Sequence, residues 1–348
     1  MENNNLYMKQ CLLLAVKGLG HVAPNPMVGC VIIHKGKVTG DGYHQQYGGP
    51  HAEVNAINSV ADKSLLSEST LFVNLEPCSH RGKTPPCVDL LIEHKIKKVV
   101  IGCVDTNALV AGKGITKLKK AGIEVVLDVL KEECRELNKR FFTFHEKKRP
   151  YIILKWARTK DDFISKNQPF KKEENWITTE ESKKLVHQWR GQEQAIMIGT
   201  NTAVLDNPEL TVRLAGGKNP LRVVIDENLT IPFSNHIFSE ETETLVFTSL
   251  NAQDRNHVSY SKTDFSKNIL PHVMQVLHER KITSVIVEGG AHLLTSLIED
   301  NLWDEARIFT GDKFFQSGLK SPLIKGKEIS TGLFGGDELL VLKNISST

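Results

Sequence analysis

Residues 70–87 read TLFVNLEPCSHRGKTPPC, and this stretch determines the interpretation of the first half of the chain. Its apolar beginning predicts a strand, which ends abruptly at Glu76 and Pro77. Cys78 follows at the end of that strand, and Cys87 lies nine residues further along the chain. Two cysteines in such a place can face a cleft and act as metal ligands.

A third candidate ligand, His51, lies at the start of a predicted helix, with Glu53 two residues later. One imidazole and two thiolates can bind zinc tetrahedrally and leave the fourth position for water, as in catalytic zinc sites. The bound water has a pKa of about 7, and its reaction still needs a proton shuttle. Glu53 would act as this shuttle without binding the metal, as in zinc base deaminases. We therefore predict about one Zn2+ per chain, held by His51, Cys78 and Cys87.

Each half of this motif has a simpler explanation on its own. A His-x-Glu pair is common by chance, and most buried cysteines are small core residues. The two halves together, in the expected order and about one helix and one strand apart, favour a deaminase. The usual deaminase spacing is Pro-Cys-x-x-Cys, whereas eight residues separate Cys78 from Cys87 here. This spacing excludes the commoner subfamilies.

The composition limits the class of protein. At 348 residues the chain is long enough for two domains, and 40% hydrophobic with 24% charged residues is typical of globular proteins. A net charge of +3 is too weak to indicate a nucleic-acid partner. The apolar run 12–16 is too short for a signal peptide or a membrane span. All six cysteines lie in the first half, which favours reduced thiols or metal ligands and a cytoplasmic location.

The first half alternates apolar runs with amphipathic segments, which predicts an α/β layer sandwich. A polar, frayed start is expected before the first helix, and Lys35-Gly36 is expected as the turn of a hairpin. The predicted elements are a helix at 8–17, strands at 28–33 and 37–43, a helix at 52–60, a strand at 70–75, a helix at 88–94, a strand at 99–104, and a helix, strand and helix ending near Phe144.

The charged stretch 146–149 ends this block, because Pro150 cannot continue the preceding helix. We therefore predict two domains, 1–147 and 148–348, each long enough to bury its own core. The second block alternates in the same way. Its predicted elements are strands at 151–156, 195–199, 221–225, 244–248 and 284–287, and helices at 179–189, at 270–281 and from about His292.

An apolar strand of the second half continues into Glu288-Gly289-Gly290, and a helix follows. A glycine pair lets main-chain amides approach a phosphate at the helix N-terminus, where the helix dipole favours negative charge. The alternative is a Gly-Gly turn that only connects strand and helix. The residues alone leave both interpretations open.

Taken together, the motifs of the chain resemble those of one family. In the first half they are the segment from Cys78 to Cys87, Asn25-Pro26, Val28-Gly29, Gly42-Tyr43-His44, Pro50-His51-Ala52-Glu53, Asp105 and Val110-Ala111-Gly112-Lys113-Gly114. In the second half they are Leu154-Lys155 with Ala157, Trp176-Ile177-Thr178, 195–199, Thr202, Asp206, Pro208, Leu210-Thr211-Val212-Arg213, Val224-Ile225-Asp226 and 287–290. Over nearly its whole length the chain is similar to the bifunctional riboflavin-biosynthesis deaminase/reductases.

The resemblance implies a cytidine-deaminase-like α/β/α sandwich followed by a dihydrofolate-reductase-like α/β domain, which binds NADPH without the Rossmann glycine fingerprint. It also implies two reactions in sequence. The first replaces the 2-amino group of 2,5-diamino-6-ribosylamino-4(3H)-pyrimidinone 5′-phosphate by oxygen. The second reduces the ribosyl group to ribityl with NADPH, which the protein orients.

The resemblance assigns further site residues by position. For the deaminase substrate they are Asn25, His44, His80, Lys83, Asp105 and Asn107. For NADPH they are Ala157, Trp176, Thr202, Asp206 and Gly290. For the reductase substrate they are Lys155, Arg190, Leu210, Arg213 and Glu288.

Some of these residues have a simpler interpretation. Asn25 lies between two prolines and can be a turn residue. Arg190 and Arg213 can clamp a phosphate, and the alternative for either is a surface salt bridge. Two segments depart from the family pattern: 105–108 read Asp-Thr-Asn-Ala instead of Asp-Pro-Asn-Pro, and 160–163 read Lys-Asp-Asp-Phe instead of Leu-Asp-Gly-Lys. Because Asp162 replaces a glycine that tolerates positive φ, the geometry of this loop is expected to differ.

Two alternative functions remain at this point. One is a nucleoside or tRNA-base deaminase with an accessory nucleotide-binding domain, which the weak net charge and the long cysteine spacing disfavour. The other is a non-enzymatic zinc-stabilised module, in which Glu53 only complements the helix dipole. For the leading hypothesis we expect a small-molecule pyrimidine ribosylamine phosphate as partner, no nucleic acid, no membrane, and a homo-oligomer.

Overall fold

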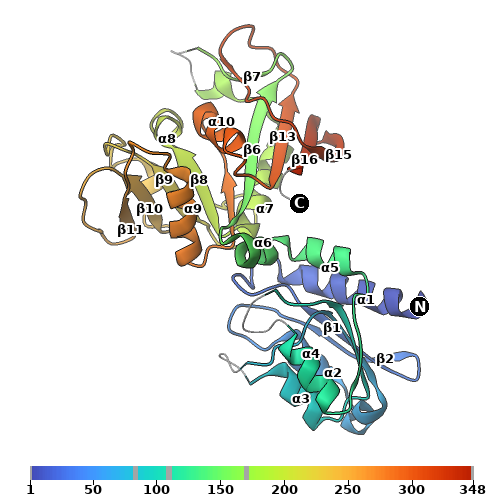
Figure 1. Cartoon of the computed structure of the whole chain (residues 1–348). Coiled ribbons are helices and arrows are strands. Elements are labelled where there is room, and N and C mark those ends of the chain that lie inside the picture. Colours follow the sequence, from blue (N-terminus) through green and yellow to red (C-terminus); the bar gives the residue numbers. More distant parts are fainter. Residues whose placement is uncertain (1, 81–84, 107–111, 168–171, 346–348) are drawn as a thin grey trace. The chain divides into compact units, whose positions relative to one another are not determined.

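The computed structural model describes residues 2–80, 85–106, 112–167 and 172–345. The chain splits into two compact units, Met1–Lys148 and Arg149–Thr348, each with its own sheet and core (Figure 1). Among the described residues there is no helix of the length and apolar character that a bilayer crossing requires.

The first unit alternates helices and strands along most of its length. Its elements are α1 (Glu2–Ala15), β1 (Gly29–His34), β2 (Lys37–Tyr43), α2 (Ala52–Ser59), β3 (Thr70–Leu75), α3 (Cys87–Glu93), β4 (Lys98–Cys103), α4 (Lys113–Lys120), β5 (Glu124–Val126), α5 (Lys131–Leu137) and α6 (Lys139–Lys147).

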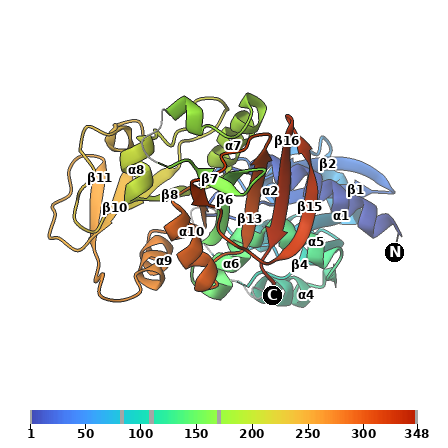
Figure 2. The same cartoon turned by 90° about the horizontal axis from the view of Figure 1, so that it is seen from above.

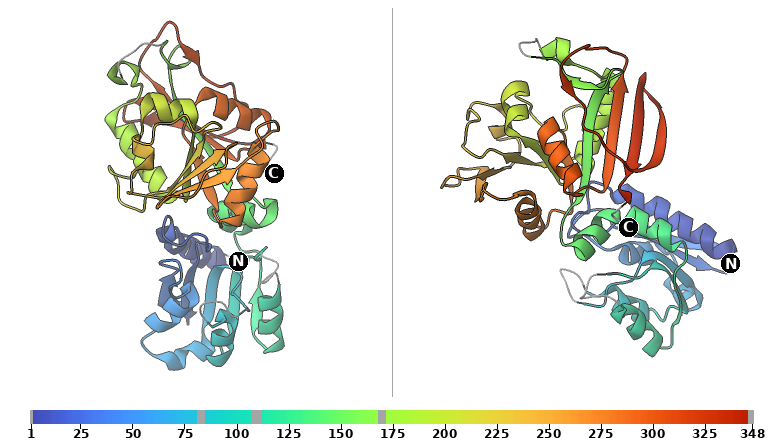
Figure 3. Two further views of the ribbon diagram at one scale, coloured as in Figure 1. Left: turned by 90° about the vertical axis from the view of Figure 1, so that its left-hand side faces the viewer. Right: turned by 45° about the horizontal axis from the view of Figure 1, so that its top comes forward.

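These elements form three layers around a five-stranded sheet of order β2-β1-β3-β4-β5 (Figure 3). β1 runs antiparallel to β2 and β3, while β3, β4 and β5 are parallel. Successive strand residues point to opposite faces, so Ile32 packs with α2, α3 and α4, whereas Val31 and Ile33 pack with α1, α5 and α6. The predicted α/β/α sandwich is confirmed.

Two expectations for this unit were wrong in detail. The start is not frayed: α1 begins at Glu2, and Tyr7 secures this part of the helix by donating to the Gly36 carbonyl at 3.1 Å. The last predicted helix is two helices, which meet at Asn138. The buried Asn138 side chain bonds both the N–H and the carbonyl of Met27, at 2.8 and 2.9 Å, and these long-range bonds leave no local sequence pattern.

The hairpin turn is confirmed at Lys35 and Gly36, whose φ values are 47° and 77°. Positive φ at both central residues is the geometry of a type I′ turn, whose twist matches that of the flanking strands. The strand register that follows places Gly42 opposite Cys30. A side chain at Gly42 would meet the main chain of α2, with its Cβ 2.5 Å from the nitrogen of Ala56. This glycine therefore lets α2 lie directly on β2. The predicted metal ligand His51 is the residue before this helix.

The second unit contains more strands than predicted. Its elements are β6 (Tyr151–Thr159), β7 (Phe163–Ser165), α7 (Glu180–Gln192), β8 (Ala195–Gly199), α8 (Thr200–Asp206), β9 (Leu221–Ile225), β10 (Thr244–Thr248), β11 (Val258–Lys262), α9 (Leu270–Glu279), β12 (Ser284–Val287), α10 (Ala291–Glu299), β13 (Glu305–Gly311), β14 (Leu319–Lys320), β15 (Lys327–Phe334) and β16 (Asp337–Lys343).

Nine of these strands form one sheet of order β11-β10-β9-β8-β12-β6-β13-β16-β15 (Figure 2). The strands from β11 to β13 are parallel, and β16 and β15 continue the sheet antiparallel. One face carries a core with α9 and α10 and the other a core with α7 and α8. Parallel strands covered on both faces are buried throughout, which explains their continuous apolar runs.

The carboxyl ends of the central strands converge at one edge of this sheet. There β8 leads into α8 at Gly199, and β12 leads through Glu288, Gly289 and Gly290 into α10. In open α/β sheets ligands bind beyond the carboxyl ends of the strands. The Gly289-Gly290 stretch, which is the predicted phosphate-binding segment, therefore lies at the edge of the sheet where such folds bind ligands.

Candidate active sites

The three predicted metal ligands come from separate elements of the first unit. His51 is the residue before α2, with extended backbone at φ −74° and ψ 166°. Cys78 lies three residues beyond the end of β3, and Cys87 is the first residue of α3. The N–H of Val88 donates to the carbonyl of Cys78 at 3.2 Å. This bond holds the end of β3 and the start of α3 together, so the two distant cysteines become neighbours.

The donor atoms of these residues converge. Nδ1 of His51 is 3.5 Å from Sγ of Cys78 and 3.3 Å from Sγ of Cys87, and all three atoms lie within 4.8 Å of one another. Zn–S bonds of about 2.3 Å and Zn–N bonds of about 2.0–2.1 Å require an N···S separation of about 3.5 Å in a tetrahedral site. The residues therefore fit a zinc ion with three protein ligands and one open position.

Glu53 lies in the first turn of α2 and is 3% exposed. Burial, followed by the charge of Cys78, raises the pKa of its carboxyl to about 6. A hydrogen bond with Cys87 lowers the pKa of Cys78 to about 4 despite burial. A buried carboxyl that exchanges its proton near neutral pH, beside a metal-binding cluster, is suited to general acid–base chemistry.

His44 and Asn25 form the next layer of this site. Nδ1 of His44 is 2.9 Å from the carbonyl of Pro50, and its Nε2 is 3.1 Å from the Asn25 amide nitrogen. Because a carbonyl can only accept, Nδ1 carries the proton, and Nε2 accepts from Asn25. Burial lowers the pKa of His44, in agreement with this neutral form. The His44 ring meets that of His51 edge-on at 5.4 Å, so both predicted residues lie beside the cluster.

The other residues predicted for the deaminase substrate differ in their exposure, and two of them are not described by the structure. Asp105 is buried just after β4, and its N–H donates to the carboxylate of Glu76, which the sequence reasoning missed. His80 is exposed, two residues beyond Cys78. Lys83 and Asn107 lie outside the described residues.

In the second unit, Lys155, Arg190 and Glu288 form a largely buried ionic cluster. Nε and Nη2 of Arg190 each donate to the Glu288 carboxylate at 2.8 Å, and Nζ of Lys155 lies 3.7 Å from it. Burial favours the neutral acid, but the charges of Arg190 and Lys155 outweigh it and lower the pKa of Glu288 to about 2. Burial lowers the pKa of Lys155. The salt bridge considered as the alternative for Arg190 is present, but it lies largely out of solvent rather than on the surface.

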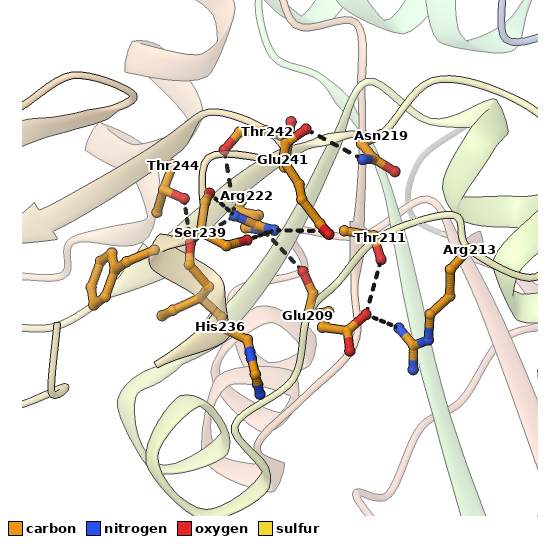
Figure 4. A network of polar contacts seen from close by, with 12 residues as sticks. Glu209, Thr211, Arg213, Asn219, Arg222, His236, Ser239, Glu241, Thr242 and Thr244 are labelled. Carbon is orange, nitrogen blue, oxygen red and sulfur yellow. Dashed lines mark hydrogen bonds and ion pairs between the residues drawn. The ribbon is translucent and has the colours of Figure 1, made fainter. Parts of the chain in front are cut away.

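The predicted segment with Leu210 and Arg213 is linked to this cluster. Nη1 of Arg190 donates to the carbonyl of Thr211 at 3.2 Å, and Leu210 is buried with φ at 58°. Arg213 forms an exposed ion pair with Glu209 at 2.9 Å, the alternative considered for it (Figure 4). The segment thus presents the Arg213 guanidinium at the surface. The carbonyl of Thr211 links its main chain to Arg190 of the ionic cluster.

Arg222 of β9 fixes the other side of this segment and was not predicted. Its fully buried guanidinium donates to the carbonyls of Glu209, Ile237 and Ser239 at 2.9, 3.0 and 2.9 Å (Figure 4). A buried charge requires such a dense set of acceptors. The signal in the sequence was an arginine inside the apolar strand Leu-Arg-Val-Val-Ile, but most of its acceptors are main-chain carbonyls of other segments.

Two of the predicted NADPH residues, Thr202 and Gly290, lie together beyond the carboxyl ends of β8 and β12. Thr202 of α8 packs against the Gly289-Gly290 stretch, where a Cβ on Gly289 would come within 2.9 Å of the Thr202 methyl carbon. Gly290 has φ at 65° and precedes α10. A side-chain-free backbone at a helix N-terminus fits a dinucleotide phosphate. Ala157 lies on β6, and Asp206 ends α8.

Trp176, the remaining predicted NADPH residue, is 39% exposed. Its indole N–H donates to the carbonyl of Thr178 at 2.6 Å, and Nζ of Lys183 lies 4.7 Å from its ring centre. The ring is therefore held in one orientation with much of its surface accessible to a ligand.

Comparisons with known proteins identify the family. The model of the RibD C-terminal domain matches residues 150–345, and that of the cytidine and deoxycytidylate deaminase zinc-binding region matches residues 1–103. The riboflavin biosynthesis protein RibD of Aquifex aeolicus is 40% identical over 323 residues, which cover 91% of this chain and 89% of that protein. The chain belongs to the RibD family.

Solved RibD structures agree with this assignment. The diaminohydroxyphosphoribosylaminopyrimidine deaminase/5-amino-6-(5-phosphoribosylamino)uracil reductase of Thermotoga maritima is 37% identical with a TM-score of 0.89, and each chain covers 99% of the other. RibD of Acinetobacter baumannii is 29% identical with a TM-score of 0.88, covering 98% of this chain and 99% of that one. The chain is accordingly a bifunctional deaminase and reductase of riboflavin biosynthesis, with zinc and NADPH as its cofactors.

The departure from the RibD pattern at Asp162 has a structural explanation. Asp162 itself takes φ at 63°, the conformation for which glycine is preferred, and aspartate tolerates it better than most residues. Nη1 of Arg158 lies 3.0 Å from its carboxylate, and the neighbouring Asp161 carboxylate accepts from the N–H groups of Phe315 and Gln316. Asp162 therefore adopts the positive φ that a glycine tolerates, while its carboxylate is paired with Arg158.

Proposed function

We propose that this RibD protein deaminates 2,5-diamino-6-ribosylamino-4(3H)-pyrimidinone 5′-phosphate at its 2-amino group and then reduces the ribosyl group of the product to ribityl. The observation that carries the proposal is the convergence of His51, Cys78 and Cys87 next to the buried Glu53, in a chain that also contains a separate reductase site. The direct test incubates purified protein with this aminopyrimidine phosphate, with and without NADPH. Deamination without NADPH, and reduction only with it, are expected.

In the deaminase site, His51, Cys78 and Cys87 would hold the metal. When bound, zinc lowers the pKa of a water molecule to about 7 and so supplies the nucleophile. Glu53 accepts a proton and delivers it to the leaving amine, a transfer for which a pKa of about 6 is suitable. Neutral His44, held by Pro50, and Asn25 orient the pyrimidine ring, while Asp105 and His80 contact the rest of the substrate. Lys83 and Asn107 keep the substrate roles that the family resemblance implies.

In the reductase site, Ala157, Trp176, Thr202, Asp206 and Gly290 would bind NADPH. When bound, NADPH supplies the hydride for the ribosyl group. Lys155 and Glu288 face the sugar as polar partners, and Leu210 borders the substrate. Arg213 has the more accessible guanidinium and binds the phosphate, since the donors of Arg190 are already engaged by Glu288 and Thr211. Arg190 therefore acts chiefly by orienting Glu288.

The proposed ligand set predicts the metal content. The wild-type protein should contain about one zinc per chain at neutral pH, because its ligands bind in their deprotonated forms. Cys87→Ser should lose most of this zinc and the deaminase activity, measured by elemental mass spectrometry and ammonia release. Cys134→Ser, a buried cysteine of α5 outside the cluster, is the matched control and should keep both. Full zinc content in Cys87→Ser would indicate a different ligand set.

We further propose that residues 1–147 form the deaminase domain and residues 148–348 the reductase domain. Each has its own sheet and cores, so each fragment should fold alone. The first fragment should deaminate without NADPH, and the second should reduce only the deaminated substrate. If the second fragment melts cooperatively but neither binds nor consumes NADPH, the assignment of the reductase to this region is wrong.

Two expectations about the cellular form of the protein stay proposals. None of the six cysteines forms a disulfide, which supports a reducing, cytoplasmic location. The homo-oligomer expected from the sequence stays a prediction, and sedimentation of the full chain would decide it. No nucleic-acid or membrane partner is proposed.

A further inference from the structure

Glu76 is a buried carboxylate inside the deaminase site that the reaction described above does not use. It directly precedes Pro77 and the metal ligand Cys78, and it is 4% exposed. Its main-chain N–H donates to the carbonyl of Cys103 at 3.0 Å, which continues the pairing of β3 with β4 beyond the end of β3. The sheet therefore fixes the main chain of Glu76, and this fixes the position from which its side chain extends.

Within the described part of the chain, the carboxylate of Glu76 accepts hydrogen bonds from four main-chain N–H groups. Oε2 accepts from Asp105 at 3.3 Å and from Gly112 at 3.0 Å. Oε1 accepts from Gly114 at 3.0 Å and from Ile115 at 3.3 Å. The donors are Asp105, which lies two residues beyond β4 and is assigned to the substrate, and residues at the start of α4. One side chain thus links Asp105 to the start of α4.

The approach of α4 to this carboxylate depends on Gly114. A Cβ at this position would lie 2.4 Å from the carbonyl oxygen of Pro77 and 3.1 Å from Oε1 of Glu76. Real Cβ atoms do not approach a carbonyl oxygen so closely, so any larger residue would move α4 away from the strand end. The start of α4 also favours a negative charge because of the helix dipole. The helix dipole and the absence of a side chain at Gly114 therefore both favour the close contact between the start of α4 and the Glu76 carboxylate.

We propose that Glu76 is a positioning residue of the deaminase, which holds Asp105 and the start of α4 against the Cys78 strand end and so sets the affinity for the substrate. The proposal rests on the assignment of Asp105 to the substrate. A buried carboxylate would be costly to desolvate without several charge-assisted bonds, and its four N–H partners supply them. Because these bonds reach the substrate segment but not the metal donors, the role concerns binding more than the chemical step.

The test is Glu76→Gln in the full-length enzyme. A glutamine of nearly the same shape has one acceptor oxygen, and its NH2 group would face N–H donors. We expect KM for the aminopyrimidine phosphate to rise at least ten-fold, kcat to change less than three-fold, and zinc to stay at about one per chain. The reductase assayed with the deaminated substrate should be unchanged. Glu124→Gln, an exposed glutamate of β5 paired with Lys98, is the matched control and should alter neither constant.

The KM and kcat values separate positioning from a merely structural role. A structural role would reduce the amount of active protein, lowering apparent kcat with KM unchanged, and this result would overturn the proposal. Loss of zinc in Glu76→Gln would also overturn it, because Glu76 would then act on the metal ligands. If this variant does not fold, Gly114→Ala disturbs the same contact without changing a charge and must raise KM alone. A wild-type enzyme that does not deaminate this substrate would instead refute the proposed function.

Discussion

Glu53→Gln is expected to lower deaminase kcat by about 10²–10⁴-fold, the usual contribution of a positioned general acid–base group. The amide has nearly the same shape but cannot take up and return a proton. Since Glu53 is not among the converging metal donors, zinc should remain at about one per chain. Ammonia release under substrate saturation measures the loss, and elemental analysis of the same sample measures the zinc.

The two units of the enzyme provide the control for this experiment. Reductase activity of Glu53→Gln on the deaminated substrate should equal that of the wild type, which shows that the protein is folded. Glu93→Gln, at the exposed end of α3, serves as the matched substitution and should leave both activities unchanged. Undiminished deamination by Glu53→Gln would refute the catalytic role and leave Glu53 as a helix-terminal acid.

The metal cluster could be predicted from the sequence because its chemistry is local. His51 precedes Glu53 by two residues, and the strand before Cys78 is stopped by Pro77. These features need no knowledge of the distant chain beyond the order of the elements. The structure adds the link between Cys78 and Val88, which brings Cys87 to the same point. Ligand identity was therefore predictable, whereas the distances between the donor atoms were not.

Glu76 and Arg222 could not be assigned from the sequence for a common physical reason. Both are buried charges whose hydrogen-bond partners are mostly main-chain N–H or carbonyl groups. Main-chain groups occur at every position, so no residue type marks them as partners. The partners of Glu76 lie 29–39 residues away, and three carbonyl acceptors of Arg222 lie 13–17 residues away. Only the folded arrangement shows which segments these charges hold.

The antiparallel end of the second sheet was also missed. All residues of β15 are exposed, and β16 alternates only partly, so neither strand presents the buried apolar pattern on which the predictions relied. The central strands β8, β9, β10 and β12 were predicted with their observed bounds, because helices cover them on both faces. Burial alone was not sufficient for a correct prediction, because β13, which is buried along nearly its whole length, was not predicted either.

The second large effect is expected at Glu288. Glu288→Gln leaves Lys155 and Arg190 buried without their counter-charge, and breaking a buried pair from one side costs about 3–5 kcal/mol. The second unit should unfold at correspondingly lower urea concentration, measured by chemical denaturation, and NADPH-dependent reduction should be lost. The exposed pair Lys160–Asp312 provides the control, since Asp312→Asn should cost less than about 1 kcal/mol.

The same carboxylate predicts a dependence on pH. The pKa of Glu288 is about 2 in the folded protein, below its ordinary value of 4.5. The unfolded chain therefore binds a proton at a higher pH than the folded chain does, so the stabilisation is complete above pH 4.5 and is lost as the pH falls towards 2. Wild-type stability should decline over this range with a component that Glu288→Gln lacks. Equal slopes in the two proteins would show that the carboxylate is not held by its cationic neighbours.

A double substitution separates the structural and the catalytic contributions of this cluster. Arg190→Gln/Glu288→Gln removes both members of the bidentate pair, so it leaves one fewer buried charge uncompensated than Glu288→Gln alone. Replacing both partners of a buried pair is less costly than removing one, and the double variant should therefore recover part of the lost stability. Reduction should not recover, because the sugar would still lack its acidic partner. If activity returned together with stability, Glu288 would serve only to neutralise Arg190, and the hydroxyl groups of the substrate would have to be bound by other residues.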